Sequence, residues 1–201
     1  MKTFLHVGCG RKNKSRCRGF NNDNWKEIRF DIDKNVNPDI VGTLIDMKSV
    51  ETASVDAVYS SYNIDHIYPH EAPIALREFY RVLKEDGIAV ISCPDLQSVC
   101  EAVAQDKLLE PLYETPEGDK ISPIDILFGW RIPIAQGNEY VAHKCGFTYS
   151  VLNSSFFEVG FKARYGGRVQ EAGAPNLFLV AFKQKKSEEE IKKIANPFFP
   201  S

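Results

Sequence analysis

The sequence has no long hydrophobic run. After Lys2 the apolar stretch reaches only to Val7 before a glycine follows. That length is too short for the core of a signal peptide and far too short to span a bilayer. No later segment reaches membrane length either, so we expect no membrane partner.

Cysteine pairs are also missing. The five cysteines lie apart, without CxxC spacing, at Cys9, Cys17, Cys93, Cys100 and Cys145. An odd number at such spacings fits reduced thiols better than a disulfide framework or a zinc site, and it predicts a cytosolic protein. No His, Asp and Glu cluster has ligand spacing in the sequence, so we expect no metal site.

Neither sign of charge is in large excess. The chain has 25 Lys and Arg against 27 Asp and Glu, for a net charge of −2, which argues against a surface built to bind nucleic acid. Hydrophobic residues make up 43% and charged residues 26%, as in soluble globular proteins. No repeat or low-complexity linker divides the 201 residues, so we expect one domain over residues 1–201.

The first half of the chain alternates strand and helix signals. A polar stretch over residues 11–26 predicts a loop with at most one short helical turn. Apolar residues at three- and four-residue steps predict an amphipathic helix over residues 70–85, ended by Gly87. Short apolar runs predict strands at residues 3–7, 27–32, 39–44, 54–60 and 87–93. Such alternation predicts a mostly parallel α/β sheet with right-handed crossovers.

The second half interrupts that pattern. After a helix expected at about residues 97–109, several prolines and scattered aromatics follow, so residues 97–150 are predicted to be an insertion or lid. A helix is expected over residues 149–159, stopped at Gly160. Two strands at residues 161–168 and 177–183 then predict a hairpin at the edge of the sheet.

The C-terminal tail, residues 185–201, is predicted to be solvated. Ser187 stands three residues before Glu190, the spacing of a capping box at a helix start. Charged pairs at four-residue spacing would stabilise this helix in water.

Gly8 and Gly10 directly follow the first predicted strand. Glycine at these positions lets the backbone approach a bound ligand closely, because a side chain would fill that space. The third glycine of a dinucleotide fingerprint is missing, and no helix start follows the turn. A pyrophosphate held at a helix N-terminus, as in nicotinamide dehydrogenases, is therefore disfavoured.

Two acidic positions favour a nucleoside ligand. Asp31 ends the second strand, 21 residues after Gly10, where a carboxylate can accept hydrogen bonds from ribose hydroxyls. Asp33 is its close competitor. Asp46 and Met47 follow the third strand, where a carboxylate can bind an adenine amino group and a thioether can pack on the ring. A helix N-cap is an equally good interpretation of Asp46.

Together, these segments resemble the class I methyltransferases, which use S-adenosylmethionine. The resemblance covers roughly residues 3–96 and rests on LHVGCG, the strand-ending aspartate, VDAVYSSYNIDHI and LREFYRVLKEDGIAVISCPDL. It implies a Rossmann-like, doubly wound sheet of seven mostly parallel strands with a reversed last strand. The sequence departs from the family in having Asp65 for a glutamate, Tyr62 for a smaller or imidazole side chain, and Glu85-Asp86-Gly87 for Pro-Gly-Gly.

The resemblance also implies which residues bind the methyl donor. Gly8 and Gly10 would face its amino-acid part, Asp31 its ribose, and the residues after the fourth strand its sulfonium. The complete set expected at the cofactor is Gly8, Cys9, Gly10, Asp31, Ile32, Asp46, Met47, Ser60, Ser61 and Tyr62.

Methyl transfer requires mainly alignment, with a base only where the acceptor must lose a proton. His66, after the fourth strand, and His143, in the insertion, are the candidate bases. A capping or positioning role is the alternative for His66, and a packing role within the insertion is the alternative for His143. Further candidates for acceptor contacts, with core or solvated positions as alternatives, are Tyr59, Tyr62, Tyr68, Tyr140 and the basic run Arg11, Lys12, Lys14, Arg16 and Arg18.

The sequence thus predicts a methyltransferase that acts on a small molecule or a sugar-like metabolite. The alternative is a non-catalytic nucleoside-binding or regulatory module on the same fold. A nicotinamide-dependent dehydrogenase comes third because its glycine fingerprint is incomplete.

Overall fold

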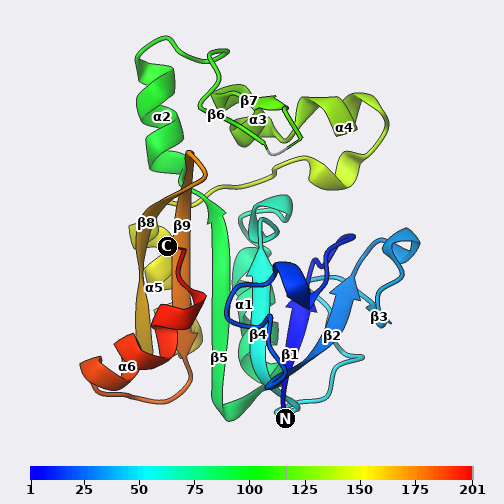
Figure 1. Ribbon diagram of the computed structural model, residues 1–201, viewed down its shortest axis with the longest axis vertical. Coiled ribbons are helices and arrows are strands. Elements are labelled where there is room, and N and C mark those ends of the chain that lie inside the picture. Colours follow the sequence, from blue (N-terminus) through cyan, green and yellow to red (C-terminus); the bar gives the residue numbers. More distant parts are fainter. Residues whose placement is uncertain (116, 201) are drawn as a thin grey trace.

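A seven-stranded sheet forms the centre of the computed structural model, which describes residues 1–115 and 117–200 (Figure 1). The strand order is β3-β2-β1-β4-β5-β9-β8. Six strands are parallel, and β9 runs antiparallel to both of its neighbours. The predicted doubly wound sheet with a reversed last strand is therefore confirmed. The strands are β1 (Lys2–Val7), β2 (Trp25–Asp31), β3 (Ile40–Val41), β4 (Val55–Ser61), β5 (Leu83–Pro94), β8 (Ala163–Glu171) and β9 (Ala174–Phe182).

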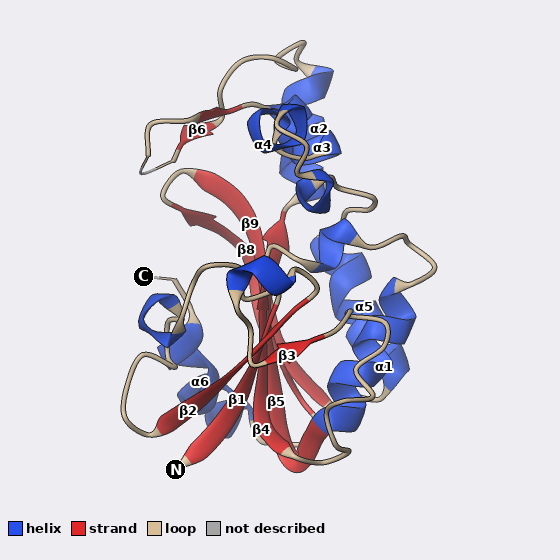
Figure 2. Ribbon diagram, turned by 90° about the vertical axis from the view of Figure 1, so that its right-hand side faces the viewer, coloured by secondary structure: helices blue, strands red, loops and turns tan. Residues whose placement is uncertain are grey.

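Helices cover both faces of this sheet (Figure 2). One face packs against α1 and α5 over a large apolar cluster, and the other carries α6 and the loop after β1 over a second cluster. The helices are α1 (Ala72–Val82), α2 (Leu96–Ala104), α3 (Pro123–Phe128), α4 (Arg131–Ala135), α5 (Tyr149–Val159) and α6 (Glu188–Ala195). Short 3-10 turns are η1 (Lys14–Arg16), η2 (Lys34–Val36), η3 (Ile64–His66), η4 (Glu139–Val141) and η5 (Asn196–Phe198).

Several elements lie where the sequence predicted them. Helix α5 spans the predicted residues, with Thr148 accepting a hydrogen bond at its start and Gly160 in the left-handed region at its end. The hairpin of β8 and β9 also forms, and every residue of β9 is buried. The predicted loop after β1 contains the single turn η1.

Other elements differ from the prediction. Helix α1 ends at Val82, because Leu83 is extended and already pairs with Val55 of β4. The third strand shrinks to the two residues of β3, and α2 ends at Ala104. In each case a tertiary contact or a turn outweighs the local apolar pattern.

The predicted solvated tail at residues 185–201, of which Ser201 lies outside the described residues, is exposed on one face and packed against the sheet on the other. The capping box of Ser187 and Glu190 does form, and α6 follows it. Ala195 and Phe198 are buried, and the Phe198 ring lies 4.8 Å from that of Phe20 between centroids. The apolar residues of α6 and η5 recur at helical spacing and cover the second cluster, a pattern that the charged pairs conceal.

The insertion, residues 97–150, lies over the carboxyl ends of the parallel strands (Figure 1). Besides most of α2 and the elements α3 and α4, it contains the small strands β6 (Tyr113–Glu114) and β7 (Lys120–Ile121). A separate small core of Val99, Ile121 and Ile126 holds it together. Pro116 lies outside the described residues.

All five cysteines are free. Within the described ranges we find no helix with the length and apolarity needed to cross a membrane.

Candidate functional site

Strands β1, β2, β4 and β5 end at the same edge of the sheet, beneath the insertion (Figure 1). The turn after β1 has Gly8 at φ 65° and Gly10 at φ 52°, a region that side chains disfavour. A side chain at Gly10 would meet no atom within 4 Å. Space therefore remains open above Gly10. The Cys9 side chain is buried, so this residue can offer a ligand only its backbone.

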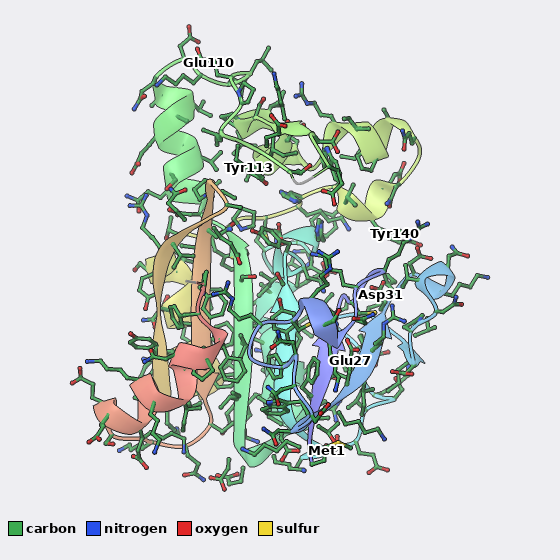
Figure 3. All side chains as sticks on the ribbon, in the orientation of Figure 1. Met1, Glu27, Asp31, Glu110, Tyr113 and Tyr140 are labelled. Carbon is green, nitrogen blue, oxygen red and sulfur yellow. The ribbon has the colours of Figure 1, made fainter. Side chains whose placement is uncertain are left out.

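Asp31 ends β2 and holds this turn (Figure 3). Its Oδ2 accepts a hydrogen bond from the Gly10 N–H at 2.7 Å, and its Oδ1 accepts one from the Asp33 N–H at 2.9 Å. Each carboxylate oxygen has a second lone pair, which can accept from a ligand hydroxyl. The competitor, Asp33, instead caps η2 through the Asn35 N–H.

Asn63 is a site residue that the sequence did not single out. A Cβ atom added to Gly8 would collide with the Asn63 side chain, so that side chain occupies the space above Gly8. The Asn63 Nδ2 is buried without a hydrogen-bond partner among the described residues, and so is the Ser60 Oγ nearby in sequence. Unpaired buried polar atoms at a strand end indicate a place where a ligand completes the hydrogen bonds.

Ser61 and Tyr62 complete the end of β4. The Ser61 Oγ accepts a hydrogen bond from the Ser92 Oγ at 2.8 Å, which ties β4 to β5. Tyr62 has φ 52°, an unusual value for a bulky residue, and such strain is common at ligand sites. Burial raises the pKa of the Tyr62 hydroxyl, which therefore stays protonated.

The expected adenine contacts are only partly supported. Met47 is fully buried in the apolar cluster beside α1, so its assignment to the adenine is wrong in this structure. Asp46 is exposed and pairs with Lys48 at 2.8 Å. Ile32 is 47% exposed next to Asp31 and offers an apolar surface to a ring.

A cavity of about 430 Å³ lies between the strand ends and the insertion. The sheet contributes Tyr62, Pro175 and Asn176, whose buried Nδ2 has no partner among the described residues. The insertion contributes aromatic rings above them, Tyr113 and Trp130 (Figure 3 labels Tyr113). The result is an apolar, aromatic space with a few polar groups, as is common in small-molecule sites.

Asp125 is the charged group of the insertion at this cavity. It receives hydrogen bonds from the Arg131 Nε at 2.6 Å and Nη2 at 3.0 Å. Burial alone would raise the pKa of the Asp125 carboxyl, but the bonds from Arg131 and the Ser122 N–H outweigh it and lower the pKa. Asp125 is therefore ionised and already paired.

His66 and His143, predicted from distant parts of the chain, lie together. Their ring centroids are 4.9 Å apart, and both rings line the cavity. The His143 Nε2 lies 3.1 Å from the Oδ2 of Asp65, which is 2% exposed. Although these residues have no ligand spacing in the sequence, the fold brings one possible ligand atom each of Asp65, His66 and His143 within 4.8 Å of the others.

The remaining candidates are divided between cavity, core and solvent. Tyr59 packs against Phe20 on the other face of the sheet, and Tyr68 and Tyr140 are exposed. In the basic run, Lys12 lines the cavity. The Lys14 Nζ instead donates to backbone carbonyls at 3.2 Å, whereas Arg11, Arg16 and Arg18 are exposed.

Comparison with known proteins shows a partial family match and a shared fold. Residues 5–91 match the family model described as a methyltransferase domain. No curated protein sequence matches the chain. The sheet and its reversed last strand give the chain the class I methyltransferase fold, and residues 5–91 are similar to the methyltransferase domain family.

Several solved structures share the fold at low sequence identity. A methyltransferase from Methanosarcina mazei has a TM-score of 0.59 at 14% identity, covering 92% of this chain and 93% of its own. A protein from Pyrococcus horikoshii has a TM-score of 0.61 at 14% identity, covering 91% and 82%. A third, from Burkholderia thailandensis, is 1,6-didemethyltoxoflavin-N1-methyltransferase with bound 1,6-didemethyltoxoflavin and S-adenosylhomocysteine. Its TM-score is 0.56 at 14% identity, covering 92% and 72%.

Proposed function

We propose that this chain transfers a methyl group from S-adenosylmethionine to a small molecule or sugar-like metabolite held in the cavity beneath the insertion. The observation that carries the proposal is the position of that cavity. It adjoins Tyr62, directly after β4, so an acceptor there would lie beside the strand ends where the donor is expected.

The donor supplies the methyl group on its sulfonium, and the chain's own residues fit it. The unpaired Asn63 Nδ2 and Ser60 Oγ would bind polar atoms of the donor. The free lone pairs of Asp31 would accept from the ribose hydroxyls, and exposed Ile32 would pack on the adenine. Open space above Gly10 leaves room for the ligand.

Catalysis by these residues consists mainly of alignment and exclusion of water. The aromatic rings of Tyr62, Tyr113 and Trp130 would hold a flat or sugar-like acceptor against the donor. We assign an acceptor contact to His143, whose Nε2 faces Asp65 at the cavity wall. His66 is a positioning residue, since backbone carbonyls lie 3.1 Å from both of its ring nitrogens.

Two further observations support a small acceptor. The cavity of about 430 Å³ has the size of a small-molecule site. The structurally similar Burkholderia thailandensis enzyme has a small molecule bound. We also propose the cytosol as the compartment, because all five thiols are free.

Titration and an acceptor screen test the proposal. Calorimetry should show binding of S-adenosylhomocysteine and none of NAD. Release of S-adenosylhomocysteine from S-adenosylmethionine, followed over a panel of phenols, nitrogen heterocycles and sugars, should then identify a methylated class. Binding without turnover on any acceptor would favour the non-catalytic nucleoside-binding module, and binding of NAD alone would reject the proposed donor.

A further inference from the structure

We infer that Asp65, His66 and His143 bind a divalent transition-metal ion at the wall of the acceptor cavity. The first two residues lie on η3, directly after β4, and the third lies in the insertion. One ligand atom from each lies within 4.8 Å of the other two. A role of this ion in methyl transfer rests on the proposed function, whereas its binding does not.

Asp65 has a buried carboxylate that lacks hydrogen-bond partners. The residue is 2% exposed, and neither oxygen has a hydrogen-bond partner among the described residues. The nearby His143 Nε2, at 3.1 Å from Oδ2, lies within ion-pair distance only. Burying a carboxylate is unfavourable unless it is hydrogen-bonded, paired with a charged side chain or bound to a cation, and a metal ion would supply the bonds that Asp65 lacks.

His143 is oriented as metal-binding histidines usually are. Its Nδ1 lies 2.6 Å from the carbonyl oxygen of Ile126, so Nδ1 bears the hydrogen that it donates. In the neutral ring Nε2 then has a lone pair, and this lone pair faces the carboxylate of Asp65. A backbone carbonyl on one nitrogen and a metal on the other is the common arrangement at metal sites.

The His66 ring has an oxygen atom near each of its two nitrogens. Its Nδ1 lies 3.1 Å from the Ala142 carbonyl oxygen, and its Nε2 lies 3.1 Å from the Tyr62 carbonyl oxygen. A neutral imidazole has only one N–H, so one nitrogen presents a lone pair to an oxygen. That contact between a lone pair and a carbonyl oxygen is unfavourable, and a small turn of the His66 ring would let the nitrogen bind a cation held between Asp65 and His143, whose ligand atoms lie within 4.8 Å.

A site of two imidazoles and one carboxylate favours divalent transition-metal ions over Mg²⁺ and Ca²⁺. Imidazole suits Zn²⁺, Co²⁺, Ni²⁺ and Fe²⁺, and two histidines with a carboxylate leave coordination positions open. His66 and His143 line the cavity of about 430 Å³. His143 and Asp65 line a second cavity of about 280 Å³. An ion between them would be able to bind an oxygen or nitrogen atom of the acceptor.

A second group of possible metal ligands consists of His6, Cys17 and Glu27. Its carboxylate, unlike that of Asp65, has hydrogen-bond partners. Glu27 lies 2.7 Å from the His6 Nδ1 through Oε1 and accepts from the Lys14 N–H at 2.9 Å through Oε2. Because both of its oxygens have partners, this group needs no ion, unlike Asp65.

Cobalt binding to the full chain tests the site. The chelator-treated protein is titrated with Co²⁺, followed by visible absorption and by metal analysis after dialysis. We expect one site of high affinity, weakened about 100-fold or more by Asp65→Asn and by His143→Ala, since loss of an outer partner alone typically costs 10- to 100-fold. The matched control His70→Ala removes an exposed histidine close by and should bind Co²⁺ as the unmodified chain does.

Thermal unfolding of each sample without metal distinguishes lost ligands from a lost fold. Asp65→Asn replaces a buried carboxylate, which has no hydrogen-bond partner among the described residues, by a neutral amide, so this variant should be at least as stable as the unmodified chain. An unmodified chain that binds no Co²⁺, or a folded Asp65→Asn variant that binds it unchanged, would overturn the inference. Titration of the same samples with S-adenosylhomocysteine tests the donor site separately, so the failure of either proposal is recognisable.

Discussion

At the scale of single residues, Asp31 has two tasks. Its carboxylate supports the turn after β1 through the Gly10 N–H, and it is the residue proposed to bind the ribose. The same side chain therefore connects the stability of the turn with binding of the donor.

We predict that Asp31→Ala weakens the affinity for S-adenosylhomocysteine by roughly 10- to 150-fold, equal to about 1.5–3 kcal/mol for bonds to a charged group. The free energy of unfolding should also fall by about 1–3 kcal/mol, because two backbone N–H groups lose their acceptor. Calorimetry and urea denaturation measure the two effects. Asp33→Ala is the control, and equal small losses of affinity in both variants would remove the ribose assignment.

The two glycines of this turn should respond differently to substitution. Gly8→Ala displaces the Asn63 side chain and adds the strain of a left-handed backbone, so it should destabilise the protein more than Gly10→Ala does. Gly10→Ala meets no atom and should cost only about 1–2 kcal/mol, the strain of a left-handed backbone. If the donor passes over Gly10, this folded variant will still lose affinity for S-adenosylhomocysteine. Affinity unchanged in calorimetry would place the donor elsewhere.

At the scale of elements, Glu78 and Arg81 of α1 bind the loop after β3 through an ion pair and hydrogen bonds that we call the brace. Arg81 donates from Nη2 to the Met47 carbonyl and from Nη1 to the Val50 carbonyl, both at 2.9 Å. Glu78 pairs with the Arg81 Nε at 2.7 Å and accepts from the Met47 N–H at 2.8 Å. The RVLK segment of the family resemblance therefore serves the fold here, and it draws Met47 into the core.

Because the brace contains the Glu78 carboxylate, we predict that the free energy of unfolding depends on pH. The hydrogen bonds from Arg81 lower the pKa of the Glu78 carboxyl, although burial opposes them. Because the folded pKa lies below the ordinary value of 4.5, the brace contributes its full stability above that pH. That contribution is lost as the pH falls through the folded pKa.

Glu78→Gln should therefore be less stable than the unmodified chain at neutral pH, and the difference should shrink in acid. Urea denaturation over a pH series measures it. Glu51→Gln, at an exposed position in the same loop region, is the control. A difference that stays constant with pH would contradict the assigned ion pair.

At the scale of the whole molecule, two unequal parts meet at the cavity beneath the insertion. The sheet has two large apolar clusters, whereas the apolar cluster within the described part of the insertion has three buried members, Val99, Ile121 and Ile126. Such a part opens at a lower free energy than the sheet that supports it.

We predict that amides of residues 105–141 exchange hydrogen faster than those of β4 and β5 in the free protein. With S-adenosylhomocysteine and an acceptor bound, the insertion should gain protection, as expected for a lid that closes over substrate. Hydrogen exchange followed by mass spectrometry measures both states. Uniform protection of the insertion, unchanged by ligands, would show that it is a fixed wall.

Elements with local signals were predictable from the sequence. Thr148 and Gly160 delimit α5 by their own conformational preferences, and the apolar run of β9 requires a strand covered on both faces. The glycine turn and Asp31 were found for the same reason, since both follow directly from the ends of buried strands.

Contacts between distant segments were not predictable in this way. The residues around Met47 fit a side chain that contacts a ligand as well as one that packs in the core. The hydrogen bond from Arg81 to the Met47 carbonyl holds this residue where its side chain is buried. Asn63 gave no signal, because its importance lies in its position over Gly8.

The sequence by itself determined the alternation of strands and helices and the position of the glycine turn that we propose faces the donor, because periodicity and glycine conformation act over neighbouring residues. Only the tertiary structure decided which side chains share the cavity beneath the insertion. The chain returns from the insertion alongside Asp65, whose carbonyl accepts from the Lys144 N–H at 2.8 Å, and this brings His143 to His66. That meeting depends on the packing of the whole insertion over the strand ends, which no local spacing encodes.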